Sequence, residues 1–255
     1  MALVDRLVAM NYDIPLRYLA RVWFSEPPKV STAKVFARIA AMLDVELEVG
    51  AIMRLDVNSG AGRSGTVLAS KETGWQVVAA PDSIDLELLG GSNQHVLLPT
   101  FLSKAADVLG FVTSISKVQG HRLAAVSEGF LGEMPEATRD DIARRLLKFP
   151  PSFEPAPYEW DWRCVQRTPR VFAGLSEQMN TIAIAKRMSG QLAAVGGTPI
   201  KFDRIRLDVD LNTTPSDEKA RFGTKHVEAF FAGAVGWHEQ LDHELLSFFG
   251  LGGGA

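Results

Sequence analysis

The sequence lacks several features that secreted and membrane proteins usually have. Its 255 residues include one cysteine, Cys164, which excludes an intramolecular disulfide and favours a reducing compartment. Charged residues interrupt the apolar stretch at positions 1–6, so no signal-peptide core is expected there. No apolar run is as long as a membrane span. We therefore expect a soluble, cytoplasmic protein that has no membrane partner.

The sequence also has no excess of charge of one sign. It has 27 Lys and Arg against 30 Asp and Glu, a net charge of −3, and neither half of the chain departs from this balance. A basic nucleic-acid-binding module would have a clear excess of Lys and Arg. Hydrophobic residues make up 46% of the chain, which is enough for an ordinary globular core.

Motifs for enzymatic chemistry are scarce. There are five histidines, and no serine has the G-x-S-x-G surroundings of a hydrolase nucleophile. Residues 60–65, Gly-Ala-Gly-Arg-Ser-Gly, fit the G-x-G-x-x-G pattern of dinucleotide-binding proteins. That pattern binds a pyrophosphate only where its last glycines open a helix, whereas residues 66–70 have the composition of a strand. We therefore expect a hairpin loop here and no cofactor.

Hydrophobic periodicity predicts the same order of elements twice. Residues 16–117 and 121–249 each indicate a strand, a helix, several strands and a long helix. We expect an α+β fold with a curved, mainly antiparallel sheet and the helices on one face. The sheet would consist of two pseudo-repeated halves, residues 1–120 and 121–255, that form one compact unit before a Gly-rich C-terminus.

Several local predictions can be compared directly with the structure. Tyr158, Trp160, Trp162 and Cys164 alternate with charged residues, which predicts a strand with these four side chains buried. Residues 180–187 and 190–196 suggest a hairpin about residues 188–190. Residues 138–141 suggest a helix-capping box. Further elements are expected at 15–24, 47–57, 66–70, 75–80, 83–89, 99–116, 204–212 and 226–249.

This order of elements resembles the saddle of the TATA-box-binding protein fold. The resemblance implies that the sheet face opposite the helices would be the binding surface, which in that family grips the DNA minor groove. On this chain we expect that face to be acidic, so we do not expect a nucleic-acid partner. The residues placed there are Glu46, Glu48, Asp56, Asp85, Glu87, Glu159, Asp161, Asp208 and Asp210, against Arg54, Arg163, Arg204 and Arg206.

A second resemblance covers the C-terminal part of the chain. Residues 207–211, Leu-Asp-Val-Asp-Leu, precede a polar spacer and a helix that opens at His226 and ends in Leu-Leu-Ser-Phe-Phe-Gly at 245–250. This arrangement resembles a sporadically distributed, uncharacterised bacterial family of about this length. The resemblance implies an intracellular protein and identifies no catalytic residue.

We interpret the chain as a non-enzymatic binding or assembly protein with a protein partner, which can be another copy of the chain. The binding residues are predicted within two strands: Glu159, Asp161, Arg163, Arg204, Arg206, Asp208 and Asp210. A partner rich in Lys and Arg would suit the expected acidic face. Nucleic-acid binding, by analogy with the saddle fold, is one alternative function.

The other alternative is a metal-dependent hydrolase. His238 and Asp242 are four residues apart in a predicted helix, so they share a face and have the spacing of metal ligands. Asp208 or Asp210 could supply a further carboxylate. A catalytic zinc site normally has three protein ligands. We therefore interpret His238 and Asp242 as a solvated local pair and expect no bound metal.

Overall fold

The computed structural model describes residues 12–28, 33–55, 62–90, 96–153, 156–192, 200–215 and 218–251. Within them lie nine strands, four α-helices and a 3₁₀ turn, η1, at Pro151–Phe153. The strands are β1 (Ile14–Phe24), β2 (Glu48–Leu55), β3 (Gly62–Ala69), β4 (Trp75–Ala79), β5 (Ser83–Leu89), β6 (Gly120–Phe130), β7 (Trp160–Phe172), β8 (Leu175–Leu192) and β9 (Ile200–Thr213). The helices are α1 (Ala33–Leu43), α2 (Leu98–Ser116), α3 (Glu136–Leu146) and α4 (Thr224–Phe249).

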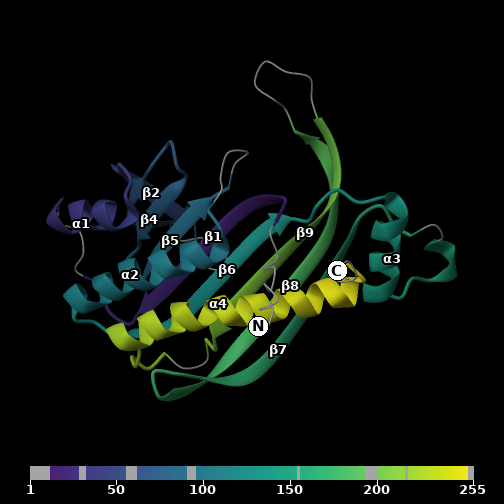
Figure 1. Cartoon of the computed structure of the whole chain (residues 1–255). Helices are drawn as coiled ribbons and strands as arrows, with labels where there is room; N and C mark the ends of the chain where they lie inside the picture. Colours follow the sequence, from purple (N-terminus) through teal and green to yellow (C-terminus); the bar gives the residue numbers. More distant parts are fainter. Residues whose placement is uncertain are drawn as a thin grey trace, which may run out of the picture.

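All nine strands form one antiparallel sheet in the order β2-β3-β4-β5-β1-β6-β9-β8-β7. The sheet is strongly curved, and α2 and α4 run beside each other along it (Figure 1). β1 and β6 pair at the centre, with β5 beside β1 and β9 beside β6. The predicted α+β class and antiparallel sheet are confirmed. The boundary predicted between residues 120 and 121 falls at the start of β6.

The covered face of the sheet is the face against which the helices pack. Along β1, the side chains of Tyr18, Ala20, Val22 and Phe24 point to this face and are buried. Alternate residues of a strand point to opposite faces, and directly paired residues of neighbouring strands share a face. The covered face therefore continues through Leu86 of β5 and Ala125 of β6, which pair with Ala20.

The two long helices pack closely because the sequence has a small residue where they meet. A Cβ atom added at Gly110 of α2 would lie 2.7 Å from Cγ of Glu228 in α4. Phe101 of α2 then fills the space toward the sheet and stacks on Trp75, with ring centroids 5.6 Å apart. None of the helices in the described ranges is long and apolar enough to cross a membrane.

Helix α3 is joined to the far end of the sheet by a buried ion-pair network. Arg187 of β8 donates hydrogen bonds to Asp203 of β9 at 2.8 and 3.0 Å and to Asp140 of α3 at 3.0 Å. Arg139 of α3 also contacts Asp203, at 3.1 Å. The hydrogen bonds from Arg187 lower the pKa of the Asp203 carboxyl. Ionised Asp203 therefore helps to hold α3 in place.

The expected hairpin about residues 188–190 is wrong. β8 is one strand of 18 residues, and its hairpin partner is β7, which is 13 residues long. The turn between them is Ala173-Gly174, where both residues have positive φ angles, 48° and 79°. Two consecutive residues with positive φ form the type I′ turn that matches the twist of paired strands. Ala is unusual in such a turn, which explains why the sequence did not predict the hairpin there.

The predicted burial fails where a strand extends past the helices that cover the sheet. Trp160 is buried as predicted, but Trp162 is half-buried against Phe248, and Tyr158 is 70% exposed. Cys164, which was expected to be buried, is exposed. Both Trp162 and Cys164 belong to β7, the outermost strand on its side. Glu159, Asp161 and Arg163 are exposed, as predicted.

Two further expectations are corrected or left open. The capping box at residues 138–141 is wrong, because α3 begins at Glu136 and these residues lie within it. Val49 of the other outer strand, β2, pairs with the buried Leu68 of β3, yet it is 65% exposed. Asp56 and the glycines at positions 60 and 61 lie outside the described residues, and Gly62 begins β3.

Candidate functional site

The candidate site is the open face of the sheet, which we define as the face opposite the helices. It includes Arg17, Leu19, Arg21 and Trp23 of β1, which alternate with the residues that face the helices; of these four, Leu19 is buried and the others are partly exposed. Strand pairing extends it through three rows of side chains, each in the order β1, β6, β9, β8 and β7. The rows are Arg21-Ala124-Asn212-Asn180-Arg167, Leu19-Val126-Asp210-Ile182-Val165 and Arg17-Glu128-Asp208-Ile184-Arg163.

Most charged side chains on the open face are neutralised by a neighbour. Arg206 contacts Asp208 at 2.7 Å and Glu128 at 2.9 Å, and Glu128 also pairs with Arg17. Arg21 forms a two-pronged pair with Asp85 of β5, at 2.5 and 2.6 Å. Bidentate pairs between Arg and a carboxylate are among the stronger polar contacts in proteins. These contacts fix the side chains of the central strands.

Trp23 lies near the guanidinium groups of two arginines at one end of the open face. Cζ of Arg122 is 4.3 Å from the Trp23 ring centroid, and Cζ of Arg21 is 5.0 Å from it. Nε of Arg122 is buried without a hydrogen-bond partner. Burial lowers the pKa of Arg122; Asp210 opposes this shift, and Arg21 adds to it. Arg122 therefore keeps an unused donor beside an aromatic ring.

A chain of amide groups runs from this end of the open face toward the outer strand β7. Arg167 donates to Asn180 at 3.0 Å, Asn180 donates to Asn212 at 3.1 Å, and Asn212 donates to Asp210 at 2.9 Å. Burial raises the pKa of Asp210, while its contact with Asn212 and the nearby Arg122 lower it. Burial likewise raises the pKa of Asp208, and Arg206 opposes that shift. Both carboxylates therefore help to order the face and are not freely hydrated.

Three basic side chains of this face make no ion pair with a carboxylate among the described residues: Arg122, Arg163 and Arg167. Arg167 is held by its hydrogen bond to Asn180, whereas Arg163 is exposed and Arg122 keeps an unpartnered donor. Asp210 lies close enough to Arg122 and Arg163 for their charges to lower its pKa. Two arginines near one partly buried carboxylate leave an excess of positive charge on this part of the face.

The structure gives the open face a composition that differs from the acidic one expected from the sequence. Register places these basic side chains on it: Arg17, Arg21, Arg122, Arg163, Arg167, Lys186, Arg204 and Arg206. The acidic ones are Glu48, Asp85, Glu87, Glu128, Asp161, Asp208 and Asp210. The charge of the described part of the face is thus near balance, and the predicted acidic excess is wrong. Glu46 lies before β2, outside the sheet.

The structure brings together most of the binding residues predicted from the sequence. Arg204, Arg206, Asp208 and Asp210 share the open face of β9, where Arg204 contacts Asp13 and Glu133. Asp161 and Arg163 share the open face of β7, and Glu159 precedes that strand. The prediction missed Trp23, Arg122 and the two asparagines. Alternation along residues 17–23 contained the signal for Trp23, whereas the asparagines come together only through strand pairing.

His238 and Asp242 lie on the covered face and are not solvated, which corrects the sequence interpretation. Their exposed fractions are 1% and 3%. Burial lowers the pKa of His238 to about 4, and the backbone of Ala125 raises it by a smaller amount. Neither ring nitrogen of His238 has a hydrogen bond of ordinary geometry. Burial and the charge of Asp242 raise the pKa of Tyr18 to about 12. The same two causes raise the pKa of Tyr12, whose hydroxyl oxygen lies 3.0 Å from that of Ser127.

These two residues do not form part of a metal-binding cluster within the described residues. No group of three or more His, Cys, Asp or Glu side chains there could hold a metal ion. Asp208 and Asp210, the proposed extra ligands, point to the open face, whereas His238 belongs to the buried side of α4 on the covered face. The sheet itself separates the carboxylates from the histidine.

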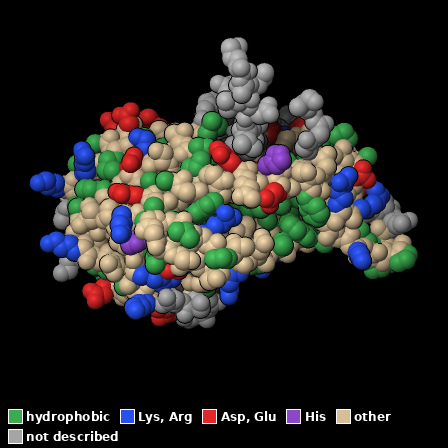
Figure 2. Space-filling model, turned by 60° about the horizontal axis from the view of Figure 1, so that its bottom comes forward, with side chains coloured by type: hydrophobic (Ala, Val, Ile, Leu, Met, Phe, Trp, Pro, Cys, Tyr) green, Lys and Arg blue, Asp and Glu red, His purple; other side chains and the backbone are tan. Residues whose placement is uncertain are grey.

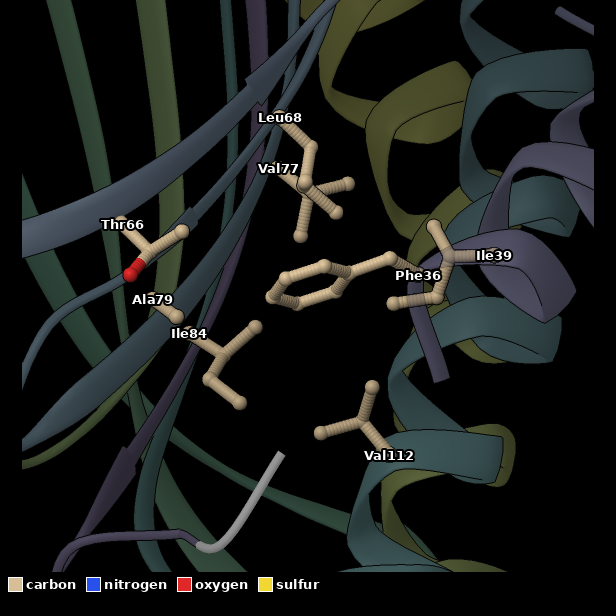
Figure 3. A pocket seen from close by; sticks show the side chains of 8 residues that line it. All are labelled: Phe36, Ile39, Thr66, Leu68, Val77, Ala79, Ile84 and Val112. Atoms are coloured by element: carbon tan, nitrogen blue, oxygen red, sulfur yellow. The ribbon is translucent and has the colours of Figure 1, made fainter. Parts of the chain in front are cut away.

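A small cavity lies on the covered face, between α1, α2 and strands β3–β5 (Figure 3). Its lining includes Phe36, Leu68, Val77, Ile84 and Val112, with Thr66 as the polar member. A catalytic or ligand-binding pocket usually has several converging polar groups among apolar ones. This cavity is therefore better explained as incomplete packing beneath the short helix α1.

The chain matches no protein-family model, and no curated protein matches it.

Proposed function

We propose that this protein is a non-enzymatic binding protein that holds a segment of a partner protein on the open face of its sheet. The observation that carries the proposal is the positive charge of Arg122 and Arg163, which no carboxylate in the described residues neutralises by an ion pair. An acidic partner segment would supply the missing carboxylates. This replaces the basic partner predicted from the sequence.

The apolar residues of the open face favour a protein segment as ligand. Val126, Ile182 and Ile184 lie between the charged rows and are partly exposed. Aliphatic contacts surrounded by arginines and an aromatic ring are typical of protein interfaces. A nucleic-acid duplex carries a continuous line of phosphates, which would also lie close to Asp208, Asp210 and Glu128, whereas a peptide can place its carboxylates beside Arg122 and Arg163 alone. The resemblance to the saddle fold therefore suggests where the site lies on the sheet, but not what binds there.

We further propose that the two halves of the chain are related, as in the saddle fold, and that the protein acts in the cytoplasm. Support for related halves comes from the central pairing of β1 with β6 and from the equivalent places of β5 and β9 beside them. The long helices α2 and α4 also follow β5 and β9 in the chain. Membership of the bacterial family stays a prediction.

The metal-dependent hydrolase receives no support from the geometry. A catalytic base must reach its substrate, and His238 and Asp242 lie on the buried side of α4. Their burial between helix and sheet supports a structural role.

The test is a comparison of captured partners. Tagged wild-type protein and the double variant Arg122→Gln/Arg163→Glu would be used to recover proteins from source cells, with quantification by mass spectrometry. The matched control is Arg144→Glu/Lys148→Gln, which makes the same change of charge on exposed positions of and just after α3. We expect a partner that the wild type and the control retain and the open-face variant loses. Thermal unfolding of each variant checks that the fold is intact.

The binding segment of that partner would then be made as a peptide and titrated against the protein. We expect an acidic segment whose affinity falls as salt rises, because its carboxylates would pair with the arginines. An identical set of partners for all three proteins would contradict the proposal. Loss of bound nucleic acid in the open-face variant alone would favour the nucleic-acid alternative.

A further inference from the structure

β7 is an outer strand of the sheet, and none of the described strands pairs with its outer edge. It pairs with β8 on one side, and Figure 1 shows it as the outermost strand at the lower border of the molecule. All side chains of residues 163–167 are exposed, including Val165 at 45%. Hydrophobic side chains lie among charged ones on this lower side of the molecule (Figure 2). An outer strand of 13 residues offers a long row of backbone donors and acceptors.

The hairpin turn determines which backbone groups of β7 point outward. In a two-residue hairpin the closing pair is hydrogen-bonded, and here that pair is Phe172 and Leu175. Hydrogen-bonded pairs alternate with non-hydrogen-bonded pairs along antiparallel strands. The even-numbered residues of β7 therefore bond to β8, and the odd-numbered ones point their N–H and C=O groups away from the sheet. Pro169, which has no N–H, lies at one of the outward positions.

We propose that two copies of the chain pair through these outer edges, antiparallel, with Cys164 of both copies at the twofold axis. In this register Asp161 of each copy lies opposite Arg167 of the other, so the dimer gains two equivalent pairs of opposite charges. Moving the axis by one residue, to Val165, would place Arg163 opposite Arg167 and bring like charges together. Charge complementarity therefore favours the register centred on Cys164 over the one centred on Val165.

The remaining side chains are compatible with this arrangement. Val165 lies opposite Arg163, whose aliphatic stem can cover it. Cys164 is a small side chain at a non-hydrogen-bonded position, where opposed side chains come closest. Pro169 would face Glu159, just outside the strand, so it interrupts no pairing between residues 160 and 168. Asp161 already contacts Lys186 at 3.0 Å, and its carboxylate can accept a second partner.

This dimer does not depend on the proposed function, because it rests on backbone pairing at the edge of β7 and on the Asp161–Arg167 pairs, whereas the partner-binding proposal rests on Arg122 and Arg163. The test is analytical ultracentrifugation of the full chain over a range of concentrations. We expect a dimer, and the single variants Arg167→Asp and Asp161→Arg should each raise the dimer dissociation constant about tenfold, because two pairs are lost and like charges replace them.

The double variant Asp161→Arg/Arg167→Asp restores opposite charges across the axis, so it should recover most of the affinity lost by either single change. Arg163→Asp is the control within the strand, and it should have the smallest effect. A bismaleimide reagent with a short spacer should join the Cys164 thiols of two wild-type copies and yield much less cross-linked dimer with Arg167→Asp. A monomer at every concentration would overturn the proposal. A dimer that ignores the charge exchange, or in which Cys164 does not cross-link, would do so as well.

Discussion

The covered and open faces of the sheet are built from alternate residues of the same strands, yet they are held in different ways. On the covered face Tyr18, Ala20 and Val22 are buried by helices, and apolar volume determines which side chains fit. On the open face Arg17 and Arg21 are ordered by carboxylates on the neighbouring strands. One face therefore stabilises the fold through burial, and the other carries polar groups that ion pairs hold in place. Substitutions on the two faces should differ in both size and kind of effect.

The largest loss of stability is expected on the covered face. Phe101 is fully buried between Tyr18 and Trp75. Phe101→Ala should lower the free energy of unfolding by about 3–5 kcal/mol, because a large cavity replaces an aromatic side chain. Chemical denaturation measures the change. Val165→Ala, at an exposed position of the open face, is the control and should change stability by less than about 0.5 kcal/mol.

The second largest change in stability is expected at His238, a buried polar residue on the covered face. Burial lowers the pKa of His238 from 6.5 to about 4, so between these values the unfolded chain binds a proton that the folded one does not. Stability should therefore fall by about 3 kcal/mol as the pH is lowered from 6.5 to 4, and the contribution is constant above 6.5.

Denaturation of wild type and His238→Leu over this pH range tests the assignment. The variant should lose most of this fall in stability between pH 6.5 and 4. His243→Leu, at an exposed position of the same helix, serves as the control. An equally steep pH dependence in the His238 variant would show that other groups cause it.

A smaller effect is expected where the helix cover ends. Trp162 of β7 is half-buried and contacts Phe248, with ring centroids 6.4 Å apart. Trp162→Ala should cost about 1–2 kcal/mol, less than a core aromatic, since part of its surface stays in water when the chain folds. Thermal or chemical unfolding measures the loss. A cost equal to that of Phe101→Ala would mean that α4 covers the outer strand fully.

The smallest effect on stability is expected at the centre of the open face. Burial raises the pKa of Asp210, so its charge is not a source of stability near neutral pH. Asp210→Asn should keep an acceptor for Asn212 and change the free energy of unfolding by no more than about 0.5 kcal/mol. It should strengthen binding of an acidic partner peptide, because it removes a carboxylate whose charge interacts with Arg122 and Arg163. Weaker binding would place the partner elsewhere.

The sequence predicted those parts of the fold that depend on local periodicity. Helices α2 and α4 and strands β1 and β9 were found because residues such as Tyr18, Val22 and Val108 repeat at the spacing of the element that contains them. The extent of helical cover was not predictable in this way. Val49 and Cys164 have the alternation of buried residues, but they lie in outer strands that no helix covers fully.

The candidate site was less predictable, since its properties come from contacts across strands. Nothing in the sequence pattern indicated that Arg122 of β6 lies beside Trp23 of β1, about a hundred positions earlier in the chain. It also could not distinguish a solvated His238 from a buried one, because helical spacing identifies a shared face but not what lies against it. Sequence alternation therefore predicted an acidic open face, whereas the side chains that strand pairing places there are nearly balanced in charge.

The central pairing of β1 with β6 has a consequence for synthesis of the chain on the ribosome. The first half can form β1 to β5 and α2 as it emerges, and β1 then has a partner on one side only. Its other edge, residues 14–24, stays unpaired until β6 has been translated. During that interval the middle strand of the finished sheet is the exposed border of the nascent one, open to pairing with another chain. Slow translation after α2 would lengthen this interval and lower the yield of folded protein.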